Sequence, residues 1–366
     1  MRKFRRFFRM VPDPRADNAW HDLLDVLFIA FAAVLCGAEN CSDMAEFGKA
    51  KEGLLRRILR LEHGIPSHDT FSRVFRLLDP QKFEQAFRRF TSSLAKINGL
   101  DLTGVVAIDG KALRGAYERG RSTTPLHMVN VWAAGARVVL AQCKAPGRNE
   151  ALGAVEVLEL LSLSGCIVTA DALHCHRAFA AKVLARDGNY VLALKKNQIA
   201  LFADAGRLFR RARQRSVAEQ LEPSTHDRRE WRRATVVRDT RMAAKHDFPG
   251  IVAVARVSCR RRPHQGRSEP LVRYFLLSKY IPAKRLLQIT RSHWSIENQL
   301  HWVLDVIFDE DRNRARKDNA PENLAILRRL AVNVLRTHPG RISMRQKVKR
   351  AGWDDAFLLS MLGQMR

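Results

Sequence analysis

The sequence lacks the long hydrophobic run that a membrane-spanning helix needs. Its longest apolar stretch, residues 26–36, has 11 residues, whereas a helix needs about 20 to cross a bilayer. An acidic, proline-containing segment at residues 12–14 precedes this stretch, and a signal peptide would not contain one. We therefore expect a buried helix here, and a cytoplasmic protein that has no membrane partner.

Cysteine is scarce and shows no pairing pattern. Six cysteines stand at positions 36, 41, 143, 166, 175 and 259, without any C-x-x-C pair. This usage is typical of a reduced, cytosolic protein. The segment His174-Cys175-His176 has no second ligand pair at zinc-finger spacing, so a structural zinc site is not expected.

Acidic residues are too few to balance the basic ones. The 366 residues include 64 Lys and Arg against 37 Asp and Glu, which leaves a net charge of +27 and a sequence pI near 10.8. A hydrophobic fraction of 46% excludes a disordered chain. Basic clusters along a folded chain predict a polyanionic partner that is bound through its phosphates, which favours DNA.

Residues 1–98 have the pattern of an all-helical domain. Helices are expected over residues 19–36, 44–61, 70–78 and 80–96. A tight Gly-Ile-Pro break separates two of them, and Ser67 or Asp69 is available to cap the next helix. This layout resembles a helix-turn-helix DNA-binding domain in which Arg73 and Arg76 face a groove. A plain helical bundle with solvated arginines fits the spacing equally well.

From residue 99 the pattern changes to alternating strands and helices. Strands are expected over residues 105–108, 126–132, 137–143, 166–170 and 190–194, and helices over 150–163, 173–186 and from 197. Three antiparallel strands followed by strand–helix units predict an α/β fold, a mixed sheet with flanking helices.

The most basic part of the chain follows this core. Strands are expected over residues 250–259 and 271–278, arginines 207–215 are expected on a helix, and Arg228 and Arg229 lie beside Trp231. Charge runs are often only solvated faces, but their number here favours a basic β-rich insertion that contacts DNA. The predicted divisions are the first part of the core (99–205), the insertion (206–286), the second part of the core (287–340) and a basic C-terminal tail (341–366).

Three acidic residues are expected to meet at one edge of the sheet. Asp109 follows a short apolar strand, and Gly110 would let the backbone turn away. Alone, this Asp-Gly pair is typical of a turn. Asp171 ends a second strand of the same kind, and Glu297 lies beside the apolar stripe of a later helix. Converging carboxylates are the ligands of a two-metal phosphoryl-transfer site, with Mg²⁺ as the expected ion.

Other groups on the Glu297 helix compete for a role at this site. His293, Glu297 and His301 share one helical face. A histidine-assisted metal site is conceivable, but Mg²⁺ prefers oxygen ligands, so we expect the histidines to contact DNA or to pack. Asp305 lies about 80° around a regular helix from Glu297, which predicts a supporting role rather than a third ligand.

These motifs together resemble one known family over nearly the full length. The chain is similar to the DDE transposases of bacterial insertion sequences, in the H-repeat-associated (ISAs-type) branch, whose catalytic core resembles RNase H and retroviral integrase. The wider superfamily carries a Tyr, an Arg and a Lys at fixed offsets from its glutamate, where this chain has His293, Thr290 and Leu304. The resemblance rests on residues 21–25, 35–38, 64–71, 107–111, 169–172, 194–198, 293–298 and 300–306.

The resemblance implies an RNase H-like core with Asp109, Asp171 and Glu297 as catalytic, metal-binding residues. It implies two Mg²⁺ ions, replaceable by Mn²⁺, that support phosphodiester hydrolysis at element ends and strand transfer into target DNA. The implied partners are double-stranded DNA, as terminal inverted repeats and target, and a second copy in a synaptic homodimer near the bacterial nucleoid. A domesticated endonuclease without transposition and a non-catalytic DNA-binding regulator are the alternatives. The expected DNA contacts are Lys111, Arg114, Lys195, Lys196, Asn197, Arg228, Arg229, Arg291, His293, Trp294 and His301.

Overall fold

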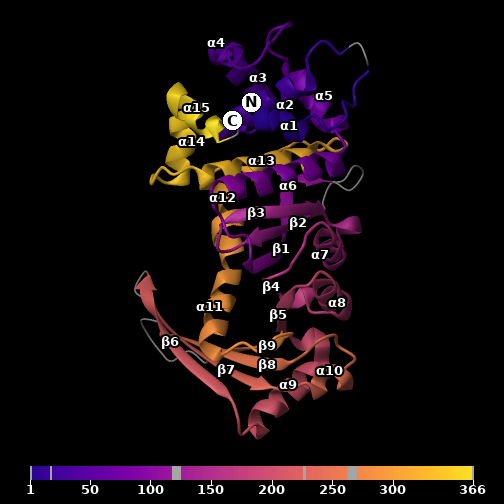
Figure 1. The fold of residues 1–366 in the computed structure, drawn as a ribbon, viewed down its shortest axis with the longest axis vertical. Helices are drawn as coiled ribbons and strands as arrows, with labels where there is room; N and C mark the ends of the chain where they lie inside the picture. Colours follow the sequence, from indigo (N-terminus) through magenta and orange to yellow (C-terminus); the bar gives the residue numbers. More distant parts are fainter. Residues whose placement is uncertain (1, 17–18, 118–124, 226–227, 263–269, 365–366) are drawn as a thin grey trace.

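The computed structural model describes residues 2–16, 19–117, 125–225, 228–262 and 270–364. Nine described strands form one mixed sheet in the order β3-β2-β1-β4-β5-β9-β8-β7-β6. The sheet runs through the middle and one end of the molecule, while helices from both ends of the sequence gather at the other end (Figure 1).

The first five strands form the core of the sheet. β1 pairs antiparallel with β2, and β2 with β3, whereas β4 runs parallel to both β1 and β5. Helices α7(Glu150–Glu159) and α8(Arg177–Ala185) bury apolar residues on one face, and α11(Ala283–His293) on the other. Both faces are covered, which explains why β1 and β4 begin as continuous apolar runs. The strands are β1(Gly104–Tyr117), β2(Pro125–Ala133), β3(Val138–Lys144), β4(Cys166–Ala170) and β5(Asn189–Leu194).

This arrangement is the predicted α/β mixed sheet with flanking helices of an RNase H-like core, and the predicted fold class is confirmed. Short helical turns η1(Pro146–Arg148), η2(Ala172–His174) and η3(Lys196–Gln198) connect its elements. Within the described residues, no helix is both long and apolar enough to cross a membrane.

The basic β-rich segment extends the same sheet. β9 pairs antiparallel with β5 at the register Leu192↔Leu276, so the sheet passes from the core into this segment without a break. Arg213 and Arg215 lie beyond the end of α9(Ile199–Arg211) and not on the helix, because the buried positions of α9 stop at Phe209. The remaining elements are β6(Ser216–Thr225), β7(Arg228–Arg238), α10(Arg241–Lys245), β8(Ala253–Arg262) and β9(Leu271–Leu277).

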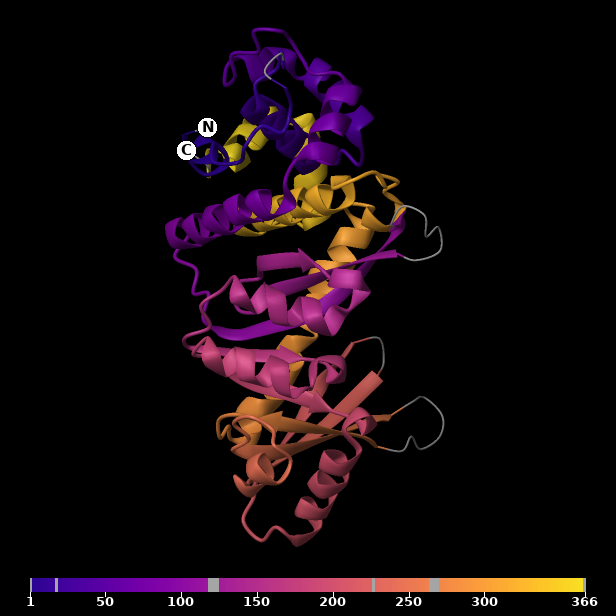
Figure 2. The ribbon, with the colours of Figure 1, turned by 90° about the vertical axis from the view of Figure 1, so that its right-hand side faces the viewer.

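The helical end of the molecule combines both termini of the sequence. Helix α2 is buried on almost every side, and α13 packs against α2, α5 and α6. Both views show α13 lying beside α6 (Figures 1 and 2). One apolar cluster includes residues from all of these helices, so the first 98 residues share their core with residues beyond 320. The helices are α1(Arg2–Phe8), α2(Leu23–Leu35), α3(Cys41–Ala50), α4(Glu52–Arg56), α5(His68–Leu77), α6(Pro80–Ile97), α13(Ala320–Thr337), α14(Met344–Trp353) and α15(Asp355–Gly363).

Candidate active site

Asp109 and Asp171 lie at the point where the pairing of β1 with β4 ends. The parallel pairing of β1 with β4 ends at Ile108↔Ala170, and the two acids follow immediately. The expectation that Gly110 turns the chain away was wrong, because β1 continues to residue 117 in pairing with β2. It is β4 that ends here, because the Asp171 carboxylate accepts the N–H of Leu173 at 2.8 Å and starts the η2 turn.

Glu297 reaches this point from a helix that lies across the sheet. The Trp132 indole donates to Ser295 Oγ at 3.0 Å, and His293 Nδ1 lies 3.1 Å from Thr169 Oγ1 on β4. These contacts hold the segment over β1 and β4. Glu297 itself begins a π-helical turn, η4(Glu297–His301), before α12(Trp302–Val306). The angle between Glu297 and Asp305 expected for a regular helix therefore does not apply.

His301 lies between two of the acids. Its Nδ1 is 3.4 Å from Glu297 Oε2 and 3.7 Å from Asp109 Oδ2. One ligand atom from each of these three residues lies within 4.8 Å of the others, which is a spacing that one metal ion could bridge. Asp171 is adjacent but is not part of this group. The contact of His301 is therefore with the acids, whereas His293 packs against β4.

The charges at the site fit a bound divalent cation. Burial, and then the charges of Glu297, Glu150 and Asp171, raise the pKa of Asp109 to about 8. His301 holds the pKa of Glu297 below its usual range through a hydrogen bond. A cation would offset the crowding of these carboxylates. The buried Nε2 of His301 has no hydrogen-bond partner among the described residues. The two carboxylates suit both Mg²⁺ and Mn²⁺.

Lys111, which was predicted to contact DNA, is buried instead. Its ammonium lies 2.5 Å from Asp305 Oδ1 and 3.4 Å from Asp311 Oδ1. Arg114, three residues further along β1, is exposed, and its guanidinium lies 3.4 Å from Asp311 Oδ2. Lys111 faces inward because β1 continues past Asp109, so that residue 111 lies under α12 and not on an outer turn.

The other predicted DNA contacts have mixed surroundings. Lys195 and Lys196 are exposed after β5, and the Asn197 side chain donates to Ala172 O at 2.7 Å, which ties the two turns together. Arg291 is exposed on α11. Trp294 is 42% exposed, and the Arg273 guanidinium lies over its ring at 5.2 Å. Arg228 and Arg229 belong to β7, but their side chains lie outside the described part of the structure.

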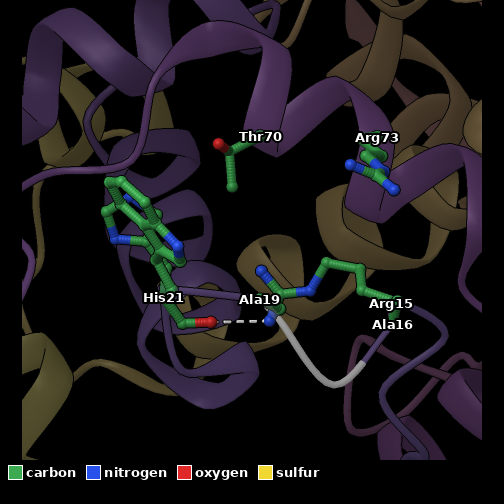
Figure 3. Close-up of a pocket in the computed structure, with 7 residues that line it drawn as sticks. Arg15, Ala16, Ala19, His21, Thr70 and Arg73 are labelled. Atoms are coloured by element: carbon green, nitrogen blue, oxygen red, sulfur yellow. Dashed lines mark hydrogen bonds between the residues drawn. The ribbon is translucent and has the colours of Figure 1, made fainter.

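The helical end also presents a polar hollow. Ser67 caps α5, as expected, by accepting the N–H of Thr70 at 3.4 Å. Arg73 is exposed and lines a hollow of about 260 Å³ together with Thr70, Arg15 and His21 (Figure 3). Arg76, in contrast, is engaged in an ion pair with Asp318 at 2.8 Å. Only the first of the two candidate arginines therefore remains available for a ligand.

Comparisons with known proteins point to one family. The model of the "Transposase DDE domain" family matches residues 101–334, and the model described as "DDE_Tnp_1-associated" matches residues 5–91. The protein YbfL of Escherichia coli (strain K12) is 31% identical over 383 residues, covering 99% of this chain and 98% of that protein. "H repeat-associated putative transposase YhhI" from the same strain is 30% identical with the same coverage.

Two further similarities are more partial. An uncharacterized protein encoded in the dhlA 3′ region of Xanthobacter autotrophicus is 40% identical over 263 residues, 70% of this chain and 88% of that protein. Among solved structures, the piggyBac transposase synaptic complex with hairpin DNA has a TM-score of 0.48 at 14% identity, covering 100% of this chain and 80% of that one.

Proposed function

The chain belongs to the family of transposases with a DDE domain, and from this premise we propose that it cleaves DNA at the ends of a mobile element. The cleavage is a metal-dependent phosphodiester hydrolysis that exposes a 3′-hydroxyl, which is then joined to target DNA. Asp109, Asp171 and Glu297 are the catalytic carboxylates. Two observations support this proposal: ligand atoms of Asp109 and Glu297 lie within 4.8 Å of each other, and Asp171 follows the end of the β1–β4 pairing beside Asp109.

The residues at the site divide into ligands and supports. Asp109 and Glu297, with His301 between them, would hold one ion. Asp171 directly follows β4, and its charge contributes to the raised pKa of Asp109. When bound, a pair of Mg²⁺ or Mn²⁺ ions supplies Lewis-acid stabilisation for the attacking and leaving oxygens. The hydrogen bond from the Trp132 indole to Ser295 and the contact of His293 with Thr169 keep the segment that carries Glu297 over the sheet.

DNA is the proposed substrate, as terminal inverted repeats and as target. The exposed cationic and aromatic side chains near the acids, at Lys195, Lys196, Arg291 and Trp294, support a DNA path across this edge of the sheet. Arg73, beside the hollow at the helical end, supports a second contact with the same DNA. Because cleavage at two ends must be coordinated, the working form is a homodimer in the synaptic complex.

Asp109→Asn, Asp171→Asn and Glu297→Gln should each reduce Mg²⁺-dependent cleavage of an end-containing DNA on the order of 10³-fold or more. DNA binding should change little, because these side chains hold the ions and not the duplex. Asp187→Asn is the matched control, since Asp187 is exposed and its left-handed backbone accepts Asn. Cleavage that persists in all three variants would contradict the proposal. Cleavage without joining to target DNA would remove the strand-transfer part alone.

A further inference from the structure

A fourth carboxylate lies against the active site. Glu150 is the first residue of α7, and its side chain rests on the backbone of Gly110, the residue after Asp109. A Cβ atom on residue 110 would overlap the carboxyl carbon and both oxygens of Glu150. The backbone of Gly110 does not have a positive φ. Glycine is therefore needed here for space, which the Glu150 carboxylate fills.

Two histidines hold this carboxylate in place. His174 Nε2 lies 3.2 Å from Glu150 Oε1, and His127 Nδ1 lies 3.7 Å from Glu150 Oε2. These contacts, with that to His174 first, lower the pKa of Glu150 despite its burial. The carboxylate thus stays charged beside Asp109, with charged or polar partners on both of its oxygens.

His174 connects Glu150 to the second catalytic acid. Its side chain is 0% exposed, and the same Nε2 that contacts Glu150 lies 3.9 Å from Asp171 Oδ1. Its ring packs on Phe179 with the centroids 5.7 Å apart, which limits its rotation. Asp171 also accepts the backbone N–H of Leu173. The Asp171 carboxylate is therefore held by one backbone donor and lies beside a buried imidazole whose Nε2 also contacts Glu150.

We propose that Glu150 is a positioning residue of the active site, which holds His174 against Asp171 through the space left by Gly110. The inference rests on the proposed catalytic role of Asp171. Removal of a residue that contacts and orients a metal-binding side chain typically lowers metal affinity or activity about 10–100-fold. Loss of Glu150 frees the imidazole to turn, and it also removes a negative charge that attracts cations to Asp109.

The first test replaces the charge alone. Glu150→Gln in the full-length protein should raise the Mg²⁺ concentration for half-maximal cleavage about 10-fold. It should weaken Mn²⁺ binding by a similar factor, as followed by electron paramagnetic resonance without DNA. Glu156→Gln, on the exposed side of α7, is the control and should leave both values unchanged. A purely structural role would lower the midpoint of thermal unfolding without moving the Mn²⁺ affinity, and this result would overturn the proposal.

The second test uses the contact with Gly110. Glu150→Ala should weaken Mn²⁺ binding as Glu150→Gln does. Gly110→Ala should displace the flexible end of Glu150 and cause a similar loss of Mn²⁺ affinity. Because the smaller side chain of Glu150→Ala leaves room for the new methyl group, the double variant should be no worse than Glu150→Ala alone. Additive losses would overturn the proposal. If Asp171→Asn retains cleavage, the catalytic role of Asp171, on which this inference rests, is refuted. If Asp171→Asn is impaired but Glu150→Gln and Gly110→Ala are not, only the role of Glu150 is refuted.

Discussion

At the scale of single residues, Glu84 shows how burial sets the charge of a side chain far from the active site. This residue of α6 pairs with Arg88 at 2.6 Å, and its other oxygen accepts the N–H of Gln142 on β3 at 3.5 Å. Its side chain is 8% exposed. Burial raises the pKa of Glu84 to about 7, although Arg88 and the Gln142 amide act in the opposite direction.

This raised pKa predicts a pH-dependent stability. Between about pH 4.5 and pH 7, the folded state keeps a proton on Glu84 that the unfolded chain releases, so stability falls as the pH rises through this window. Glu84→Gln removes the effect. The unfolding free energy of the variant relative to the parent should increase by on the order of 2 to 3 kcal/mol from pH 4.5 to pH 8. Urea unfolding at several pH values measures it, and a pH-independent difference would contradict it.

The residues of the site were predictable to different degrees. Asp109 and Asp171 follow short β-branched runs, and this local pattern survives in the structure even though the strand at Asp109 continues. The roles of Glu150 and Lys111 were missed, because each depends on a partner distant in sequence. The position of Glu150 in the sequence gives no indication that its side chain lies beside Asp109. The one local hint is Gly110, which in the sequence indicates a turn and in the structure makes room for a carboxylate.

At the scale of elements, the Lys111–Asp305 ion pair connects the strand that carries Asp109 to the helix that follows Glu297. Lys111 is 6% exposed at its side chain, and Asp311 is a second acceptor for its ammonium. The charge of Lys111 also lowers the pKa of Glu297. This pair therefore fixes α12 relative to β1 and keeps Asp109 and Glu297, the two acids proposed to bind metal, at their observed separation.

Disruption of this pair should impair cleavage without a specific loss of DNA affinity. Lys111→Met and Asp305→Asn should each slow cleavage, and a double-mutant cycle on unfolding free energy should give a coupling of about 1 to 3 kcal/mol. Our prediction from the sequence, that Lys111 contacts DNA, gives a different outcome. In that case Lys111→Met would weaken DNA binding and reduce its salt dependence by about one counterion, while Asp305→Asn would have no effect.

Helices and strands were predicted best where the sequence contains a buried β-branched run. Four of the five core strands, β2 to β5, appear close to their expected bounds, because buried β-branched runs have few alternatives. The π-helical turn at Glu297 was not predictable, since the spacing of Ile296, Leu300 and Val303 also fits a regular α-helix. The length of β1 was underestimated for a related reason, because its last residues pair with β2 and that pairing leaves no local signal.

At the scale of the whole molecule, the helical end and the sheet are joined by a buried polar side chain. Asn333 on α13 accepts the N–H of Val139 at 2.8 Å and donates to Val139 O at 2.9 Å and to Thr91 Oγ1 at 3.1 Å. It thus links α13, α6 and β3. These three elements come from separate parts of the sequence. The apolar pattern of a helix does not indicate which other element the helix packs against, so this shared core was not predictable.

The link at Asn333 predicts that the two ends unfold together. Asn333→Leu has a similar volume but leaves the buried N–H and C=O of Val139 unpaired, which should cost about 2 to 4 kcal/mol. Thr91→Val removes one hydrogen bond and leaves Val139 paired, so its cost should be about 1 kcal/mol. Native-state hydrogen exchange would measure both, and amides of α6 and β3 should lose protection by the same free energy. A loss of protection confined to α6 would mean that the helical end opens independently of the sheet. In that case the shared core would not couple the proposed DNA contacts at the helical end to the proposed cleavage at the sheet.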